Sequence, residues 1–192
     1  MALERERTQV KAFLSWVAEF QSKAQESEKF SGVHVDIEPY LLPEWLSDRD
    51  SVIRQWQSSM EFICRFAKQE QLHAGADMPF WFDEIPVPGQ DSSLSSWMIN
   101  QFDSITIMAY RDSAERILSA SEQELQEAAL LGKQVILAVE TNPSRETPSV
   151  TFYEEGRLYM EEQLMAVQRL ADEYASFGGF AVHDYHGWKS LK

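Results

Sequence analysis

The sequence predicts an α/β fold built on a parallel sheet, and two periodicities lead to this prediction. Short segments that are apolar, or that alternate apolar and polar residues, indicate strands at 32–40, 76–82, 104–110, 133–140 and 179–183. Apolar residues at helical spacing indicate helices at 3–25, 48–71, 94–102, 121–132 and 151–176. Because helices and strands alternate regularly, we expect a parallel sheet with the helices outside it.

The loops help to distinguish a barrel from an open sheet. Loops after the predicted helices are short, whereas loops after the strands are long and hold most of the Trp, Tyr, Asp, Glu and His residues that stand out. Function at the carboxyl ends of all strands is typical of a (β/α)8 TIM barrel, although a doubly wound sheet also binds ligands at that edge. No glycine-rich phosphate fingerprint follows a strand, which weakens the nucleotide-binding alternative.

Individual helices carry further signals. The first helix has its apolar stripe at Val10, Phe13, Leu14, Val17 and Phe20. Two candidate capping boxes, Ser121 with Glu124 and Thr151 with Glu154, predict the starts of the last two helices. Gly132 predicts the end of the first of these two.

Composition limits the classes of function. A chain of 192 residues with 44% hydrophobic content is enough for one core, so we expect a single domain over residues 1–192. A net charge of −14 repels nucleic acid and anionic membrane surfaces, so we expect no nucleic-acid partner. The sequence shows neither a membrane span nor a signal peptide. Cys64 lies in an apolar helical run and has no second cysteine to pair with.

The strand at 32–40 carries the clearest chemical signal. Alternation places His34, Asp36 and Glu38 on one face and apolar residues on the other. An exposed antiparallel strand would show the same pattern. Here, however, a long helical segment follows instead of a hairpin turn, which indicates a covered parallel sheet. Acidic side chains in such a sheet need a reason, because burying an unpaired charge is costly.

Two short motifs resemble the chitinase-like family-18 glycoside hydrolases, which are TIM barrels. Asp36-Ile37-Glu38 is similar to the end of the family's fourth strand, where spaced aspartates precede a catalytic glutamate, and Met108-Ala109-Tyr110 is similar to the Met-x-Tyr-Asp of its sixth strand. The last strand, ending near Trp188, resembles the eighth, which carries a tryptophan under the sugar. The sequence departs from the family at Ser31 and His34, where aspartates are usual, and at Arg111, which replaces the aspartate after the tyrosine.

The resemblance implies a substrate-assisted retaining mechanism on a carbohydrate. Glu38 would be the general acid and later the base, Asp36 would raise its proton affinity and orient an acetamido group of the substrate, and Tyr110 would hydrogen-bond that group. We expect Asp36, Glu38 and Tyr110 to meet in one cleft with Glu140 at its wall. The resemblance also implies a secreted or cell-surface protein.

The same alignment makes the barrel incomplete. If the acidic strand is the fourth, the sequence contains strands four to eight with their helices, and the first three βα units are missing. Two explanations remain open. Either the chain belongs to a longer protein, or a partner such as a second copy covers the open sheet edge.

Two other functions remain open. Glu38 is followed by proline and Glu140 ends a strand, as in two-carboxylate retaining glycosidases, where Glu140 would be the nucleophile. The asparagine that usually precedes the acid there is Ile37 in this sequence. The third possibility is a non-catalytic carbohydrate-binding barrel, because a fold does not determine a function.

Further candidate substrate-binding residues follow the strands. Flat aromatic faces suit sugar rings, although each ring taken singly fits core packing as well. The aromatic candidates are Tyr40, Trp45, Trp81, Tyr185 and Trp188, and the others are His34, Asp83, Met108, Arg111 and His183. His183, Asp184 and His186 form a weak metal signal, so we expect no metal and no cofactor.

Overall fold

The computed structural model describes residues 1–192, and its centre is a five-stranded sheet. The strands pair in sequence order and all neighbours are parallel, which confirms the predicted α/β class. Their bounds are β1 Gly32–Val35, β2 His73–Pro79, β3 Ser104–Met108, β4 Gln134–Glu140 and β5 Phe177–His183. β1 and β5 each have one neighbour, so the sheet is open at both edges.

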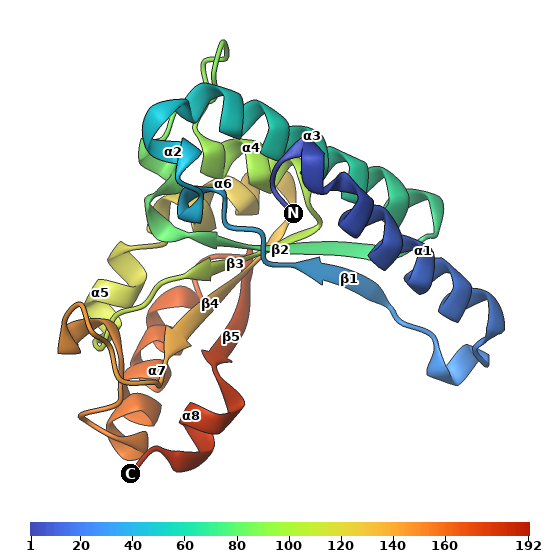
Figure 1. The fold of residues 1–192 in the computed structure, drawn as a ribbon. Helices are drawn as coiled ribbons and strands as arrows, with labels where there is room; N and C mark the ends of the chain where they lie inside the picture. The colour runs from blue at the N-terminus through green and yellow to red at the C-terminus, as the bar shows by residue number, and fades with distance from the viewer.

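Four helices that lie between the strands in sequence, α3, α4, α6 and α7, cover the outer face of the sheet (Figure 1). Contacts pair α3 with β2, α4 with β3, α6 with β4 and α7 with β5. The α-helices are α1 Arg7–Lys23, α2 Glu44–Ser47, α3 Arg49–Gln69, α4 Leu94–Gln101, α5 Ala114–Ser119, α6 Glu122–Leu131, α7 Arg157–Ala171 and α8 Tyr185–Ser190. The 3-10 helices are η1 Glu4–Glu6, η2 Glu26–Glu28, η3 Pro39–Leu41, η4 Phe80–Glu84 and η5 Pro148–Val150. No helix is long and apolar enough to span a bilayer.

The two faces of the sheet differ in chemistry. Alternate side chains of each strand point outward into the core beneath the helices, where they are buried: Val33, Val35, Ala74, Ala76, Met78, Ile105, Ile107, Val135, Leu137 and Val139. The intervening residues form the inner, concave face, and on β1 and β2 these include His34 and Asp77. The functional candidates of the acidic strand therefore share the inner face.

Three predicted strand ends are wrong in detail. β3 ends at Met108, two residues before the predicted end. β1 ends at Val35, before the extended Glu38 that precedes η3. β2 ends at Pro79, where the residues up to Glu84 form η4 instead of the predicted strand end at Phe82. Proline lacks the N–H that a strand partner would accept, so it is a natural end to the pairing.

Both predicted capping boxes are wrong. The Ser121 hydroxyl donates to the carbonyl of Ile117 at 2.9 Å, so it caps no N–H of α6. The Thr151 hydroxyl donates to the carbonyl of Asn142 at 2.8 Å, and α7 begins later, at Arg157. Each hydroxyl bonds a carbonyl of the preceding segment, a competing pattern open to Ser and Thr.

Three short α-helices were not expected. α2 precedes α3, α5 follows β3, and α8 replaces the predicted extended continuation after β5. A signal for α8 is present in the sequence, because the Asp184 side chain accepts a hydrogen bond from the Gly187 N–H at 2.8 Å and so caps the helix.

Candidate active site

A cleft of about 390 Å³ opens at the carboxyl ends of the strands. Four loops build its wall, one after each of β1 to β4. The lining side chains include Glu38, Tyr40, Phe80, Trp81, Met108, Tyr110, Arg111, Glu140 and Asn142. The expected meeting of Glu38, Tyr110 and Glu140 in one cleft is therefore found, but Asp36 is not among the lining residues.

Glu38 is held from two sides. Its Oε1 accepts a hydrogen bond from the Tyr40 hydroxyl, and the carbonyl of the preceding Ile37 accepts one from Trp56 Nε1 at 2.8 Å. Trp56 is fully buried, so the turn that presents Glu38 is anchored in the core. Burial raises the pKa of Glu38 above its ordinary value, and the charges of Asp36 and Asp77 raise it further.

Asp36 lies on the inner face, beside a second acid that the sequence reasoning missed. Val35 pairs with Ala76, which places Asp36 next to Asp77 of β2. Asp36 is an exposed residue, yet partial desolvation of its carboxyl group raises its pKa, and the charge of Asp77 adds to this. An aspartate between alanine and methionine in an otherwise apolar strand was the available signal for Asp77.

His34 pairs with Asp77. His34 Nε2 lies 3.0 Å from Asp77 Oδ1, and this hydrogen bond raises the pKa of His34 above its ordinary value. Gly75 makes the contact possible, because a Cβ at that position would lie 2.5 Å from His34 Nδ1. The inner face thus carries a His34–Asp77 pair directly beside Asp36.

Tyr110 extends the site across β3. Its ring centroid lies 6.2 Å from that of His183, with the two planes tilted by 36°. Burial first, and then the charge of Glu140, raise the pKa of Tyr110 well above its ordinary value. The phenol therefore keeps its proton at neutral pH and remains a hydrogen-bond donor.

Glu140 is surrounded by donors. Its Oε1 accepts from the Thr141 N–H at 2.8 Å, the Asn142 N–H at 2.7 Å and Asn142 Nδ2 at 2.9 Å. Its Oε2 lies 2.8 Å from His183 Nδ1. A carboxylate with this many donors is fixed in place, with Oε1 saturated and Oε2 held by one partner.

The remaining candidates divide between the cleft and other regions. Trp81 and Tyr40 stand edge to face on the cleft wall, with centroids 5.0 Å apart, and Arg111 lies 4.3 Å over the Phe80 ring. Trp45 is buried behind Trp81, while Asp83 lines a different pocket. Tyr185 and Trp188 lie on α8 outside the cleft, and Arg157 stacks on Trp188. No three His, Cys, Asp or Glu side chains are placed to hold a metal ion.

Comparison with known proteins supports the fold. The structure is similar to the crystal structure of the GH18 chitinase ChiB from the chitin utilization locus of Flavobacterium johnsoniae, with a TM-score of 0.54 and 14% sequence identity. The fold is TIM-barrel-like and partial. The superposition covers 96% of this chain and 62% of the chitinase chain. No family model matches the sequence, and no curated protein matches it.

Proposed function

We propose that this chain carries the acid/base half of a glycoside hydrolase site, with Glu38 as general acid and base. The observation that supports this most is the half-buried Glu38 in a cleft with Tyr110, its pKa raised by burial and by two neighbouring carboxylates. Such a carboxyl group stays protonated to a higher pH, which suits a general acid.

The reaction would proceed in two steps on a sugar that carries an acetamido group. Glu38 gives its proton to the glycosidic oxygen as the C1–O bond breaks, and the acetamido oxygen bonds to C1. The Glu38 carboxylate then removes a proton from water, whose oxygen attacks C1 and releases the acetamido group, so that configuration is retained. Tyr110 would donate its hydrogen bond to the acetamido oxygen.

The His34–Asp77 pair would replace the aspartate that the family carries at position 34. Asp36 lies beside this pair, and the charge of His34 lowers the pKa of Asp36 while the charge of Asp77 raises it. Asp36 would thus keep a charged neighbour that orients it. We propose that Asp77 of β2 compensates for the absence of an aspartate at position 34.

We assign Glu140 a positioning role toward His183. In the two-carboxylate mechanism a carboxylate oxygen attacks C1, whereas Glu140 Oε1 accepts three hydrogen bonds and Oε2 is directed at His183 Nδ1, 2.8 Å away. No observation therefore favours Glu140 as a nucleophile. The non-catalytic binding function remains the competing proposal.

The test is Glu38→Gln assayed on a chromogenic oligomer of N-acetylglucosamine. We expect kcat to fall by about 10²- to 10⁴-fold while oligomer binding persists. Glu154→Gln, an exposed carboxylate without a hydrogen-bond partner in the structure, is the matched control and should change neither quantity. Equal activity in Glu38→Gln and wild type would refute the assignment, and binding without turnover in both would support the binding function.

We further propose that additional βα units complete the barrel beside β1. The edge of β1 is unpaired, and next to it α1 and the segment before β1 expose a stacked aromatic cluster of Phe13, Trp16, Phe20 and Phe30. The chain spans 62% of the length of the barrel chitinase that it matches, so further units, from more of the same polypeptide or from another, fit this edge better than a second copy. A monomeric residue 1–192 chain in sedimentation supports this, and a dimer that Trp16→Gln dissociates would assign the cluster to a second copy.

A further inference from the structure

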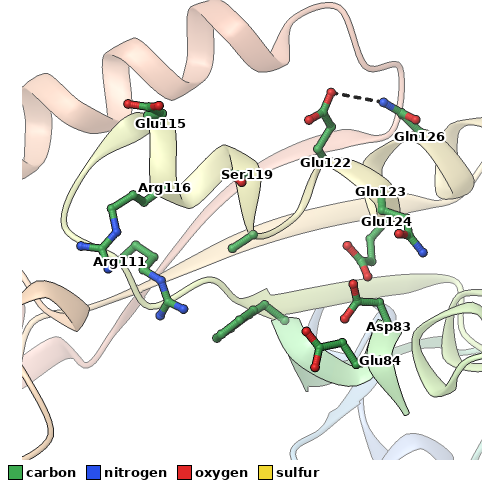
Figure 2. A pocket seen from close by; sticks show the side chains of 12 residues that line it. Asp83, Glu84, Arg111, Glu115, Arg116, Ser119, Glu122, Gln123, Glu124 and Gln126 are labelled. Carbon is green, nitrogen blue, oxygen red and sulfur yellow. Dashed lines mark hydrogen bonds between the residues drawn. The ribbon is translucent and has the colours of Figure 1, made fainter. Parts of the chain in front are cut away.

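A second cavity, of about 760 Å³, lies beside the cleft and between η4 and the helices α5 and α6. It shares Phe80 and Arg111 with the cleft, so the two cavities have a common wall. Figure 2 shows its two ends. Arg111 and Arg116 lie at one end, and Asp83, Glu84 and Glu124 lie at the other.

Glu124 is the unusual side chain of this cavity. It is only 2% exposed, and its Oε1 has no hydrogen-bond partner. Its carboxyl group points toward Asp83 (Figure 2). The Ser95 hydroxyl lies near the carboxyl group but does not satisfy Oε1. A buried carboxyl oxygen without a hydrogen-bond partner is costly, so Glu124 Oε1 can accept a hydrogen bond from a ligand.

The acidic end also lacks internal cations. None of Asp83, Glu84 and Glu124 takes part in an ion pair, whereas Arg116 pairs with Asp112. Burial raises the pKa of Glu124 to about 7, and the charge of Asp83 contributes to this shift. A positive group between the two acids would remove both the repulsion and the unsatisfied acceptor.

We propose that this cavity binds a protonated amino group between Glu124 and Asp83, and that the group belongs to an amino sugar next to the residue in the cleft. The inference rests on the proposed glycosidase function for the identity of the ligand. An ammonium group has three donors and needs only acceptor oxygens around it. A metal ion would need more ligands than the His, Cys, Asp and Glu side chains supply here.

The common wall connects the site to the cleft. Arg111 lies 4.3 Å over the Phe80 ring, and both residues line both cavities, so a sugar in the cleft and a neighbouring sugar at the second cavity would contact the same two side chains. Gln123 and Gln126 on the same wall supply amide groups for hydroxyls. The ligand class is therefore an oligosaccharide with at least one free amino group.

The test is calorimetric titration of residues 1–192 with a glucosamine tetramer, in a Glu38→Gln background that prevents cleavage and at a pH at which the amino groups are protonated. Glu124→Gln, which keeps the shape of the side chain, should weaken binding by about 10- to 100-fold, and Asp83→Asn should act in the same direction. The N-acetylated tetramer should bind equally well to all variants. Glu161→Gln, an exposed acid on α7, is the matched control for net charge.

A second measurement, on a chain that keeps Glu124, does not depend on whether the Glu124→Gln variant folds. The ¹³C shift of the Glu124 carboxyl group should move toward the ionised form when the glucosamine tetramer is added to a chain with wild-type Glu124. The proposal is overturned if the tetramer leaves that shift unchanged, or if wild type and Glu124→Gln bind it equally.

The two proposals can fail separately. If the N-acetylated oligomer is never cleaved but binding of the glucosamine tetramer depends on Glu124, the glycosidase proposal fails and the ammonium site stands. If cleavage depends on Glu38 but binding of the glucosamine tetramer does not depend on Glu124, the ammonium site fails and the glycosidase proposal stands. Binding of 1,5-diaminopentane with the same Glu124 dependence, without binding of the tetramer, would overturn the amino sugar.

Discussion

The outer and inner faces of the sheet arise from the same alternation of side chains, but the outer face is buried and apolar whereas the inner face carries titratable groups. Side chains such as Leu137 and Ile107 on the outer face are fully buried under the helices. On the inner face, His34 pairs with Asp77 and His183 pairs with Glu140, and in each pair the histidine is the more exposed partner. The contrast shows that the packing that stabilises the fold is concentrated on one face, which leaves the other available for titratable groups.

Truncating one of two adjacent residues of β4 should give the largest difference in the free energy of unfolding between the two faces. Leu137 is fully buried on the outer face, and Ile136 is partly buried on the inner face. We expect Leu137→Ala to lower the free energy of unfolding by about 2–5 kcal/mol, because it leaves a cavity in the core. Ile136→Ala, the control of similar volume, should lower it by less than half as much in urea denaturation. Equal losses would show that the inner face is packed as a core.

Glu124 is the exception on the helix side, because it is a buried acid in the outer layer. Its pKa is raised from 4.5 to about 7, so its favourable contribution to stability is complete below 4.5 and is lost as the pH rises through 7. Because glutamine does not ionise, Glu124→Gln removes this loss of stability at high pH. We expect it to raise the free energy of unfolding at pH 8 by about 1–3 kcal/mol and to change it little at pH 4.

Thermal or urea denaturation at the two pH values measures this effect. Glu127→Gln, on the same helix and hydrogen-bonded to Ser96, tests whether any acid of α6 behaves alike. A Glu124→Gln protein that is less stable at pH 8 would mean that the ionised carboxylate has a stabilising partner.

On the inner face the expected effect is on pH dependence. A general acid must be protonated, so the alkaline limb of kcat/KM should follow the pKa of Glu38. The charge of Asp36 raises that pKa, and burial, the larger cause, is unaffected by a change at Asp36. Asp36→Asn should therefore move the alkaline limb to lower pH.

The position of the limb is informative even if Asp36→Asn also lowers the rate. Glu161→Gln should leave the limb in place, because this acid lies on α7. A limb that moves to higher pH in Asp36→Asn would contradict the like-charge argument.

The sequence predicted the layers and the acidic strand but not the contacts that complete the site. Alternation in 32–40 was enough to place His34 and Asp36 on one face, because side-chain direction in a strand is local. The partner of His34 is Asp77, and their contact depends on the register of β1 with β2 and on the small Gly75. Neither can be read from the period of one strand.

The burial of aromatic residues also could not be predicted from the local sequence. Trp45 and Trp81 both follow strands, yet Trp45 is buried and Trp81 lines the cleft. Their sequence neighbourhoods do not differ in a way that separates core from surface, because each lies in a helical segment, α2 or η4, that is too short to show a regular period. The hydroxyls of Ser121 and Thr151 failed as caps for a related reason, since a capping motif does not say which backbone group is nearer in space.

The first helix repeats the contrast of the two faces on a smaller scale and gives the smallest expected effect. Val17 is 2% exposed, whereas its neighbour Trp16 is 53% exposed and packs against other aromatic rings of the cluster. We expect Trp16→Gln to change the free energy of unfolding by no more than about 0.5 kcal/mol. Val17→Ala, the matched control, should lower it by about 1–3 kcal/mol. If urea denaturation shows a larger loss for Trp16→Gln, the aromatic cluster belongs to the core of this chain and is not a surface awaiting further βα units.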